Sequence, residues 1–385
     1  MNSNGARKRI RDGAAGSRVA ASALLHFALL VVLSVPGCLP DAKIKIPYND
    51  TPVALDDGWP LATPESQGFD RAALTHAYEV FFSEDDYVPA RSLLVVRNGY
   101  LVAEGYCREA DDIREKRAIQ SATKSVTSIL TGIAVDLGLL GDFERTLYDI
   151  IPDKFGPDPA KRTITLRQLM TMKSGIDFDN DVFTLEMEHY VRGDGIAHIL
   201  GKPLAYEPGT VYNYQDCDPH LLSAAIARLA GISLEEFAVE HLFRKIGISD
   251  YVWLKHHDGT TYGGYGLYLT PRDMARIGNL MVDGGHWEGE QVVSENWVYI
   301  STAKQTSVDP ENDAHGFDYG YYWWRVSEVG AFTAYGHGGQ YIFVVPAKDL
   351  VIVLTAEPDT DGETAAIDLA EFLPLARLII DAASD

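Results

Sequence analysis

The spacing of hydrophobic residues along the chain predicts β-strands near both of its ends. Apolar runs at 92–96 and 101–105 are joined by Asn98-Gly99, a dipeptide typical of a tight hairpin turn. A second pair of apolar runs, 341–345 and 350–354, flanks a short turn near the C-terminus. The pattern therefore predicts one hairpin close to each end of the folded part of the chain.

Apolar residues at three- and four-residue steps predict helices around and between these hairpins. One helix is expected over 69–82, one over 121–137 with a buried apolar face, and one over 365–380 with a kink at Pro374. Capping residues and prolines at the first turn predict four further helix starts: Thr165, Asp218-Pro219, Ser233 and Thr270-Pro271.

Strands at both ends and helices in the middle predict an α+β fold of the α/β-sandwich type. We expect one antiparallel sheet built from the N- and C-terminal strands and flanked by helices, with a mostly helical lobe inserted over about 142–260. The folded domain is expected over 61–385. The segment 38–60 is rich in Pro and Asp without clear periodicity, which predicts a tether.

Residues 1–37 have the composition of an export signal. Basic residues precede an apolar run from Val19 to Val35, which ends in Pro36-Gly37-Cys38. A small residue followed by Cys resembles a bacterial lipoprotein cleavage site, so we expect lipid on Cys38, a membrane tether, and a location in the periplasm or cell envelope. Plain secretion stays open, and so does an uncleaved anchor, because the run approaches the length of a bilayer span.

The net charge limits the expected partners, and the cysteines leave one question open. The chain carries a formal net charge of −22 at pH 7, which repels polyanions, so nucleic acid is not expected as a partner. A small-molecule substrate is expected instead. If Cys38 is lipidated, Cys107 and Cys217 are either a disulfide pair or two buried thiols, and the sequence leaves both readings open.

The first candidate for chemistry is Ser121-Ala-Thr-Lys124. Residues three apart on a helix share a face, so a Lys124 amine that burial has deprotonated could accept the proton of the Ser121 hydroxyl. The start of a long apolar helix also favours a developing oxyanion. Ser301-Thr-Ala-Lys304 has the same spacing ahead of a polar stretch, which shows that spacing alone is weak evidence.

The second candidate is Tyr214, on a loop ahead of the helix predicted at Asp218-Pro219. A phenol near an ammonium group could shuttle a proton between nucleophile and leaving group. The chain has 20 tyrosines, so a single loop Tyr is more often a packing residue with a hydrogen-bonded tip.

The third candidate is His337-Gly338-Gly339-Gln340 at the head of a predicted strand. Paired glycines allow a substrate to lie close to the strand backbone, and the Gln340 N–H is a candidate oxyanion donor beside that of Ser121. The alternative is a glycine-rich turn with an exposed His337.

In this order, Ser121-Ala-Thr-Lys124, Tyr214-Gln215-Asp216 and His337-Gly338-Gly339 resemble the SxxK, YxN and KTG/HTG motifs of the serine β-lactamase and penicillin-binding-protein superfamily. The similarity covers most of the chain after residue 61. It is nearest to the branch of class C β-lactamases, family VIII esterases and 6-aminohexanoate-dimer hydrolases. The resemblance implies a β-lactamase/transpeptidase-like fold and an acyl-enzyme on Ser121. It also implies that Lys124 and Tyr214 share general-base and general-acid work, and that the N–H groups of Ser121 and Gln340 form the oxyanion hole.

Two departures from these motifs bear on the substrate. Asp216 replaces the usual Asn, and an ionised carboxylate accepts hydrogen bonds without donating any. His337 replaces the Lys that would hold a substrate carboxylate, and histidine is mostly neutral at pH 7. Both changes favour neutral esters or amine-bearing amides over penicillin-type substrates.

We therefore expect a carboxylesterase or an amidase of the aminohexanoate-oligomer type. The alternatives are a D,D-peptidase or β-lactamase and, from another class, a non-catalytic receptor for cell-wall fragments. No metal or cofactor is expected, because His256-His257-Asp258 has no third ligand at a plausible spacing and is expected on a solvated loop.

Overall fold

The computed structural model describes residues 49–83, 87, 89–308, 317–357 and 366–384. The predicted export signal and Cys38 lie outside these residues. In the part of the chain that is described, no helix has both the length and the apolar character needed to cross a bilayer.

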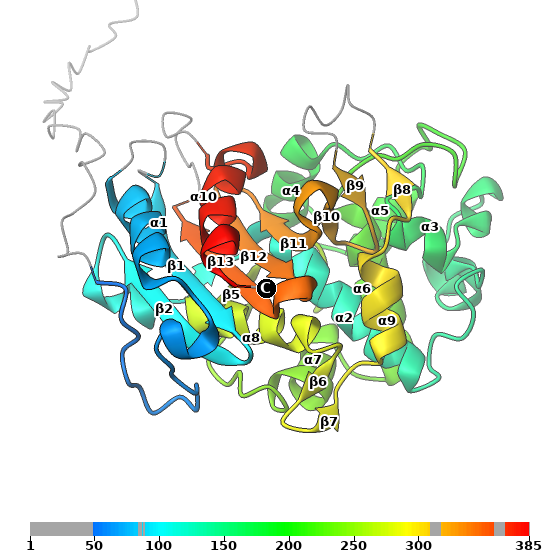
Figure 1. The fold of residues 1–385 in the computed structure, drawn as a ribbon. Coiled ribbons are helices and arrows are strands. Elements are labelled where there is room, and N and C mark those ends of the chain that lie inside the picture. The colour runs from blue at the N-terminus through cyan, green and yellow to red at the C-terminus, as the bar shows by residue number, and fades with distance from the viewer. Residues whose placement is uncertain (1–48, 84–86, 88, 309–316, 358–365, 385) are drawn as a thin grey trace, which may run out of the picture. The chain divides into compact units, whose positions relative to one another are not determined.

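One eight-stranded antiparallel sheet forms the centre of the domain (Figure 1). Its strand order is β2-β1-β13-β12-β11-β10-β9-β8, so the strands of the N-terminal hairpin lie beside the last strand of the chain. The strands have these bounds: β1 Ala90–Arg97, β2 Tyr100–Tyr106, β8 Thr306–Ser307, β9 Asp318–Tyr319, β10 Trp324–Val326, β11 Ala331–Gly336, β12 Gln340–Val345 and β13 Leu350–Ala356. Both predicted hairpins are therefore present, and they belong to one sheet.

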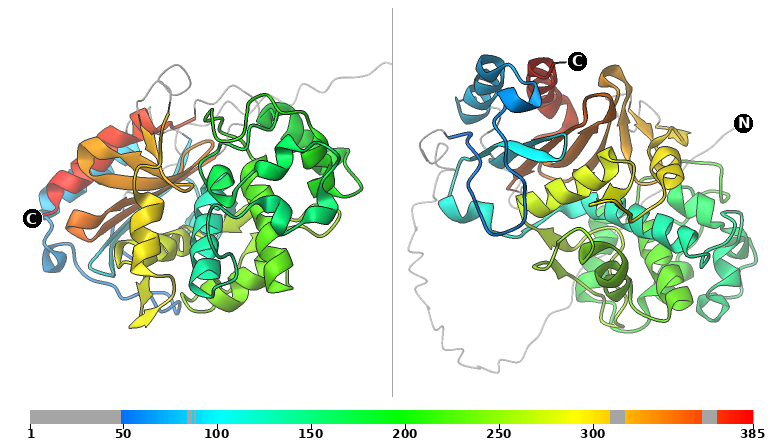
Figure 2. Two further views of the ribbon diagram at one scale, coloured as in Figure 1. Left: turned by 90° about the vertical axis from the view of Figure 1, so that its right-hand side faces the viewer. Right: turned by 60° about the horizontal axis from the view of Figure 1, so that its bottom comes forward.

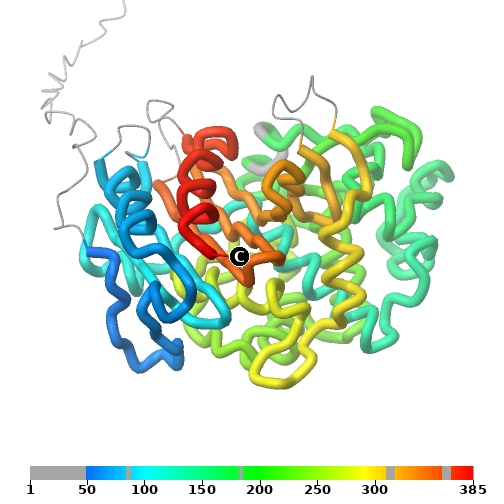
Figure 3. Tube along the Cα trace, in the orientation of Figure 1, coloured from blue at the N-terminus to red at the C-terminus, as the bar shows by residue number. Residues whose placement is uncertain are grey.

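The two ends of the described chain meet on one face of this sheet. Helices α1 (Arg71–Ser83) and α10 (Leu369–Ala382) pack together there, and Figure 3 shows them side by side in blue and red. In β13, alternate residues such as Ile352 and Leu354 join the apolar core under these helices, while Val351 and Val353 join the core on the opposite face. This period of two explains why the strand is apolar throughout.

Helices α8 (Pro271–Val282) and α2 (Thr123–Asp136) belong to the core on the opposite face, and α8 packs directly on β12 and β13. The left view of Figure 2 shows the green helices of the middle of the chain beside α2. These and the remaining helices have the following bounds: α3 Leu166–Met170, α4 Asn180–His189, α5 Gly195–Gly201, α6 Cys217–Ala230, α7 Leu234–Ala238 and α9 Glu295–Thr302. Short strands β3 Arg117–Ala118, β4 Val252–Trp253 and β5 Leu267–Leu269 form a small second sheet, and β6 His286–Trp287 pairs with β7 Glu290–Gln291. The predicted α+β fold, with its antiparallel sheet from both ends of the chain, is confirmed.

Several helix ends follow the capping chemistry of the sequence. The Thr165 and Ser233 side chains each accept a hydrogen bond from the third residue of their helix, in reciprocal capping boxes. Helix α10 begins only after Asp368, which caps it, and it continues past Pro374. Helix α6 begins at Cys217, ahead of the predicted Asp218-Pro219 start.

The described part of the predicted tether contacts the domain. Asp50 accepts a hydrogen bond from Arg71 at 2.8 Å, and the buried Arg272 donates to Asp57 and to the Val53 carbonyl, both at 2.7 Å. This segment has no regular secondary structure. It packs on the domain because the buried Arg272 guanidinium needs hydrogen-bond acceptors, which the segment supplies. Its composition gave no sign of these contacts.

Cys107 and Cys217 are both buried and are not joined in a disulfide, so the structure supports the reading of them as separate thiols.

Candidate active site

Ser121 lies in a short 3-10 turn, η4 (Gln120–Ala122), directly ahead of α2. Gln120 has a positive φ of 51°, which is rare for a residue with a side chain and indicates a tightly constrained turn. Ser121 is half-buried, and the residues that follow it in the first turns of α2 are buried. The turn therefore presents one hydroxyl at the surface of an otherwise buried helix start.

The Lys124 side chain lies beneath this hydroxyl. Its Nζ atom is 2.9 Å from Ser121 Oγ, 2.9 Å from the Gly264 carbonyl oxygen and 2.5 Å from Asp216 Oδ1. Only 1% of Lys124 is exposed, which makes it one of the largest fully buried side chains among the described residues. The structure thus brings Ser121, Lys124 and Asp216 into direct contact.

The charge on Lys124 is set by two opposing effects. Burial lowers the pKa of an amine, but here the Asp216 carboxylate and, to a smaller extent, the Tyr214 phenol outweigh burial and raise the pKa of Lys124 above its usual value. The condition on which Lys124 was expected to act as a base, loss of its proton through burial, is therefore opposed by Asp216 in the resting protein. A neighbouring carboxylate keeps the ammonium form.

Tyr214 also lies at this cluster. The Lys124 Nζ is 4.8 Å from the centre of the Tyr214 ring, within the range of a cation–π contact. The ring packs edge-on against Tyr319 at 6.1 Å and tilted against Trp324 at 5.7 Å between ring centres. These contacts hold the phenol of Tyr214 next to the ammonium group.

Asp216 stands at the start of α6, but its carboxylate does not cap that helix. Its backbone N–H instead donates to Asn180 Oδ1 at 2.8 Å, and its side chain, 12% exposed, points to Lys124. Asn180 and Gly264 were not identified from the sequence. The Gly263-Gly264 doublet was the available signal for a backbone that approaches another element closely.

The glycine-rich hairpin turn lies against the turn that carries Ser121. A Cβ atom at Gly336 would come within 2.1 Å of the Ile119 carbonyl oxygen, so the close approach requires glycine there. Gly338 and Gly339 have φ values of 85° and 108°, which other residues rarely adopt. The end of β11 and the start of β12 are thereby held beside the Ser121 segment.

His337 and Gln340 occupy different environments in this hairpin. His337 is exposed at the turn. The Gln340 side chain is fully buried and donates from Nε2 to the Ala356 carbonyl at 2.7 Å, which ties β12 to the end of β13. This contact accounts for the Gln340 side chain, while the oxyanion role of its backbone N–H stays a prediction.

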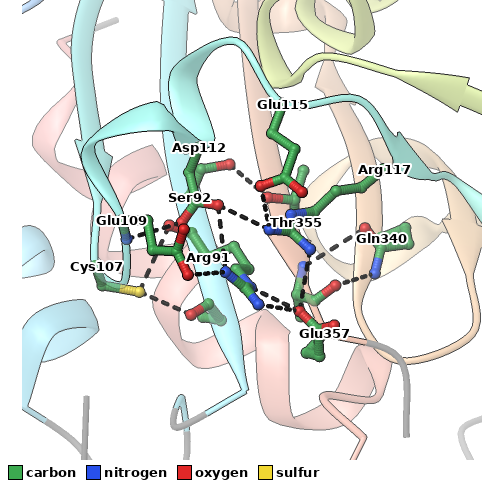
Figure 4. Close-up of polar contacts among 12 residues, drawn as sticks. Arg91, Ser92, Cys107, Glu109, Asp112, Glu115, Arg117, Gln340, Thr355 and Glu357 are labelled. Carbon is green, nitrogen blue, oxygen red and sulfur yellow. Dashed lines mark hydrogen bonds and ion pairs between the residues drawn. The ribbon is translucent and has the colours of Figure 1, made fainter. Parts of the chain in front are cut away.

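An ion-pair network anchors the segment that leads into Ser121 (Figure 4). Arg117 donates to Asp112 at 2.9 Å and to Glu357 at 3.1 Å, and Arg91 donates to the same two carboxylates at 3.3 and 2.6 Å. Asp112 is 1% exposed, so its charge depends on both arginines. The network connects β3, which precedes Ser121, to the ends of β1 and β13.

A second buried polar cluster lies behind the site and was not identified from the sequence. Asp218 accepts hydrogen bonds from Gln215 Nε2 at 3.0 Å and from the Ser174 N–H at 3.4 Å. Gln215 Nε2 also donates to Ser174 Oγ at 2.8 Å. Burial raises the pKa of Asp218 to about 7 against the opposing effect of these hydrogen bonds.

The repeated Ser-x-x-Lys pattern at Ser301 does not form a comparable site. Ser301 is fully buried in α9 and bonds to the Val298 carbonyl, while Lys304 is half-exposed and pairs with Asp318 at 2.7 Å. The helix ends before Lys304, so the two side chains do not share a face.

His256 was expected on a solvated loop, but its side chain is buried. His256 is 2% exposed, with Nδ1 3.1 Å from Asp258 and Nε2 2.9 Å from the Val191 carbonyl. Among the described residues, no group of three or more His, Cys, Asp or Glu side chains is arranged to hold a metal ion.

A cavity of about 630 Å³ lies away from Ser121, between the 55–58 segment and α8, and is lined by the Arg272–Asp57 ion pair. Its walls carry paired charges, and the Thr270 hydroxyl there donates to Asp273 at 2.7 Å as part of the cap of α8. The chemistry of the protein is better sought at the Ser121 cluster, where a hydroxyl, an amine and a carboxylate meet.

Comparison with known proteins identifies relatives and structures of similar fold. The chain is 26% identical over 291 residues to the 6-aminohexanoate-dimer hydrolase of Paenarthrobacter ureafaciens, covering 70% of this chain and 73% of that protein. The crystal structure of a family VIII carboxylesterase is similar with a TM-score of 0.66 at 18% identity, covering 84% of this chain and 98% of that one. A penicillin-binding-protein homologue from Caulobacter crescentus is similar with a TM-score of 0.66 at 15% identity, covering 87% of this chain and 100% of that one.

At these identities the two structures establish the fold alone. The sequence itself matches the Beta-lactamase family over residues 78–372, a span that contains Ser121, Lys124, Tyr214 and the glycine-rich hairpin. The protein thus belongs to the Beta-lactamase family.

Proposed function

We propose that this protein is a serine hydrolase that forms an acyl-enzyme on Ser121 and cleaves a carboxylic ester or amide. The observation that carries the proposal is the 2.9 Å contact between Lys124 Nζ and Ser121 Oγ in a buried cluster. The nucleophile attacks the substrate carbonyl, the leaving group departs with a proton, and water then releases the acyl group. Tyr214, beside the ammonium, is the candidate donor of the proton to the leaving group.

The oxyanion of the tetrahedral intermediate is expected between the backbone N–H groups of Ser121 and Gln340. The close packing of Gly336 on Ile119 supports this assignment, because it fixes the hairpin against the nucleophile turn. Both donors belong to rigid backbone, so they need little reorganisation during the reaction.

The charges around Ser121 favour neutral or amine-bearing substrates. Asp216 pairs with Lys124 at 2.5 Å, and His337 replaces the cation that would hold a substrate carboxylate. The proposed substrates are short-chain esters or amides of ω-amino acids, and the similarity to a 6-aminohexanoate-dimer hydrolase supports the second class. A D,D-peptidase or β-lactamase is the alternative, and efficient turnover of a chromogenic cephalosporin would favour it.

The nucleophile is tested by treating the purified protein with a fluorophosphonate and locating the adduct by mass spectrometry. We expect modification of Ser121, loss of esterase activity in parallel, and no adduct in Ser121→Ala. Ser301→Ala is the matched control, since Ser301 has the same sequence spacing but is buried in α9. An adduct at Ser301, or full activity in Ser121→Ala, contradicts the proposal, and the second result would favour a catalytic site elsewhere.

Attachment to a membrane through Cys38 is a separate proposal. It is tested by fractionating cells that express the wild-type chain and Cys38→Ser. We expect the wild-type protein in the membrane fraction and the variant in the soluble periplasmic or secreted fraction. Equal distribution of both would show that Cys38 is not the anchor.

A further inference from the structure

The Asp216 carboxylate is the shortest contact of the buried Lys124 amine. Asp216 Oδ1 lies 2.5 Å from Lys124 Nζ, with the two side chains 12% and 1% exposed. In the motif that this segment resembles, the residue is Asn. An amide oxygen accepts a hydrogen bond from an ammonium but is not a useful proton acceptor, whereas a carboxylate can bind a proton and become a neutral acid.

The other partners of Lys124 explain why this difference matters. The Gly264 carbonyl, at 2.9 Å, and the Asp216 carboxylate can only accept hydrogen bonds, and Ser121 Oγ at 2.9 Å takes the third N–H of an ammonium. An ammonium has no lone pair with which to accept the Ser121 proton. Lys124 can therefore deprotonate Ser121 only if it gives up a proton of its own at the same time.

We infer that Asp216 is the final acceptor of the Ser121 proton and acts through Lys124, as a positioning residue that makes a charged lysine competent for proton transfer. This inference rests on the proposed function. The Ser121 Oγ–H bond breaks and its proton passes to Lys124 Nζ, while an Nζ–H bond breaks and its proton passes to Asp216 Oδ1. The Oγ electron pair forms the bond to the substrate carbonyl carbon, so Lys124 stays an ammonium and Asp216 becomes a neutral acid.

The surroundings of the pair are compatible with this exchange. Tyr214 lies against Lys124, and the titratable groups that interact electrostatically with Asp216 are Glu188 of α4, Tyr265, Tyr319, and Cys217 and His220 of α6. His220, on the same helix as Cys217, lines a small cavity with Asp216. None of these groups lies between Lys124 Nζ and Asp216 Oδ1, which are in direct contact.

The test is the rate of Ser121 phosphonylation by a fluorophosphonate between pH 5 and pH 10. Asp216→Asn is compared with wild type, with Asp216→Glu, and with Glu188→Gln as the matched control, since Glu188 interacts with Asp216 but makes no contact with Lys124 that would relay a proton. If Asp216 is the acceptor, the acid limb of Asp216→Asn moves up by at least about one pH unit, because the variant must then wait for Lys124 itself to deprotonate. Its rate should approach the wild-type rate at the alkaline end. Asp216→Glu keeps a carboxylate, so the acid limb of its pH–rate profile should match that of wild type. The profile of Glu188→Gln should match it as well.

A rate that falls by the same factor at every pH in Asp216→Asn, or an unchanged profile, would overturn the inference. Failure of Ser121 to react in the wild-type protein would instead overturn the proposed function, so the two failures are distinguishable. If Asp216→Asn does not fold, the rate of Ser121 phosphonylation in the wild-type protein is measured in mixtures of H₂O and D₂O instead. Two protons in flight give a bowed dependence of the rate on deuterium content, and a linear dependence contradicts the relay.

Discussion

Gly336 packs directly on Ile119: a methyl group added to the glycine would lie 2.1 Å from the Ile119 carbonyl oxygen. This contact joins the end of β11 to the turn that carries Ser121. Because the neighbour is backbone, Gly336→Ala must displace either the hairpin or the nucleophile turn. We expect a loss of about 1–3 kcal/mol in the free energy of unfolding. A loss of at least about tenfold in kcat should accompany it, since misplacement of the reacting groups is costly.

Gly156→Ala is the matched control for this substitution. A Cβ atom at Gly156 would meet nothing within 4 Å, and its φ lies outside the left-handed region. Urea unfolding and esterase kinetics should show a loss of stability and of kcat in Gly336→Ala and wild-type values in Gly156→Ala. Wild-type kcat in Gly336→Ala would show that the close approach does not position the site.

The hairpins and several helix starts could be predicted because their signals are local. Asn98-Gly99 specifies a tight turn between two apolar runs, and the capping boxes at Thr165 and Ser233 have the expected geometry. The pairing of β1 with β13, in contrast, depends on contacts between residues more than 200 positions apart in sequence, such as Leu93 with Leu354. It was inferred only from the general rule that apolar strands share a sheet.

The site was only partly predictable for the same reason. Ser121 and Lys124 are close in sequence, so their contact follows from helical spacing. The charge on Lys124 does not, because it is set by Asp216, a residue 92 positions later. The sequence indicated a lysine that could act as a base if burial removed its proton, and it placed Asp216 among the substrate-binding residues, whereas the fold pairs the two side chains.

Tyr214→Phe should separate a proton-transfer role from a packing role. The phenylalanine ring keeps the contacts with Tyr319 and Trp324, so stability should change by less than about 1 kcal/mol. If the phenol transfers a proton, kcat should fall by about 10²–10⁴-fold. Tyr212→Phe is the control, because Tyr212 packs on the same Tyr319 ring at 5.6 Å and should keep its activity. Equal, small effects in both variants would assign Tyr214 to packing.

Arg117→Met removes one of two arginines from the buried Asp112. Asp112 is 1% exposed and would keep one arginine, Arg91 at 3.3 Å, and the Glu109 N–H at 3.1 Å. We expect the free energy of unfolding to fall by about 1–3 kcal/mol, since a buried charge loses a partner. Urea unfolding monitored by fluorescence measures this change.

Arg377→Met is the corresponding control at the surface. Arg377 pairs with Glu328 at 2.5 Å, but each side chain is 49% exposed, so the pair should contribute less than about 1 kcal/mol. A smaller loss in Arg117→Met than in Arg377→Met would mean that the network in Figure 4 does not anchor the Ser121 segment.

His220 should make the stability of the protein depend on pH. It is 3% exposed on α6, its ring packs on Tyr262, and neither ring nitrogen has a hydrogen-bond partner of good geometry. Burial lowers the pKa of His220 to about 4, against 6.5 for the ordinary group. The folded protein therefore keeps His220 neutral, while the unfolded chain takes up a proton as the pH falls below 6.5. The stability that depends on the neutral ring is fully present above pH 6.5 and is lost as the pH falls towards 4.

Between pH 7.5 and pH 5 this one group should cost about 2 kcal/mol of unfolding free energy, by proton linkage. His220→Phe removes the titration and keeps an aromatic ring beside Tyr262, so its unfolding free energy should fall by about 2 kcal/mol less than that of wild type over the same interval. His76→Gln removes an exposed histidine, 62% exposed in its side chain, and should follow the wild-type pH dependence. Urea unfolding of the three proteins at both pH values measures the difference, and parallel behaviour of His220→Phe and wild type would mean that the buried ring does not control acid stability.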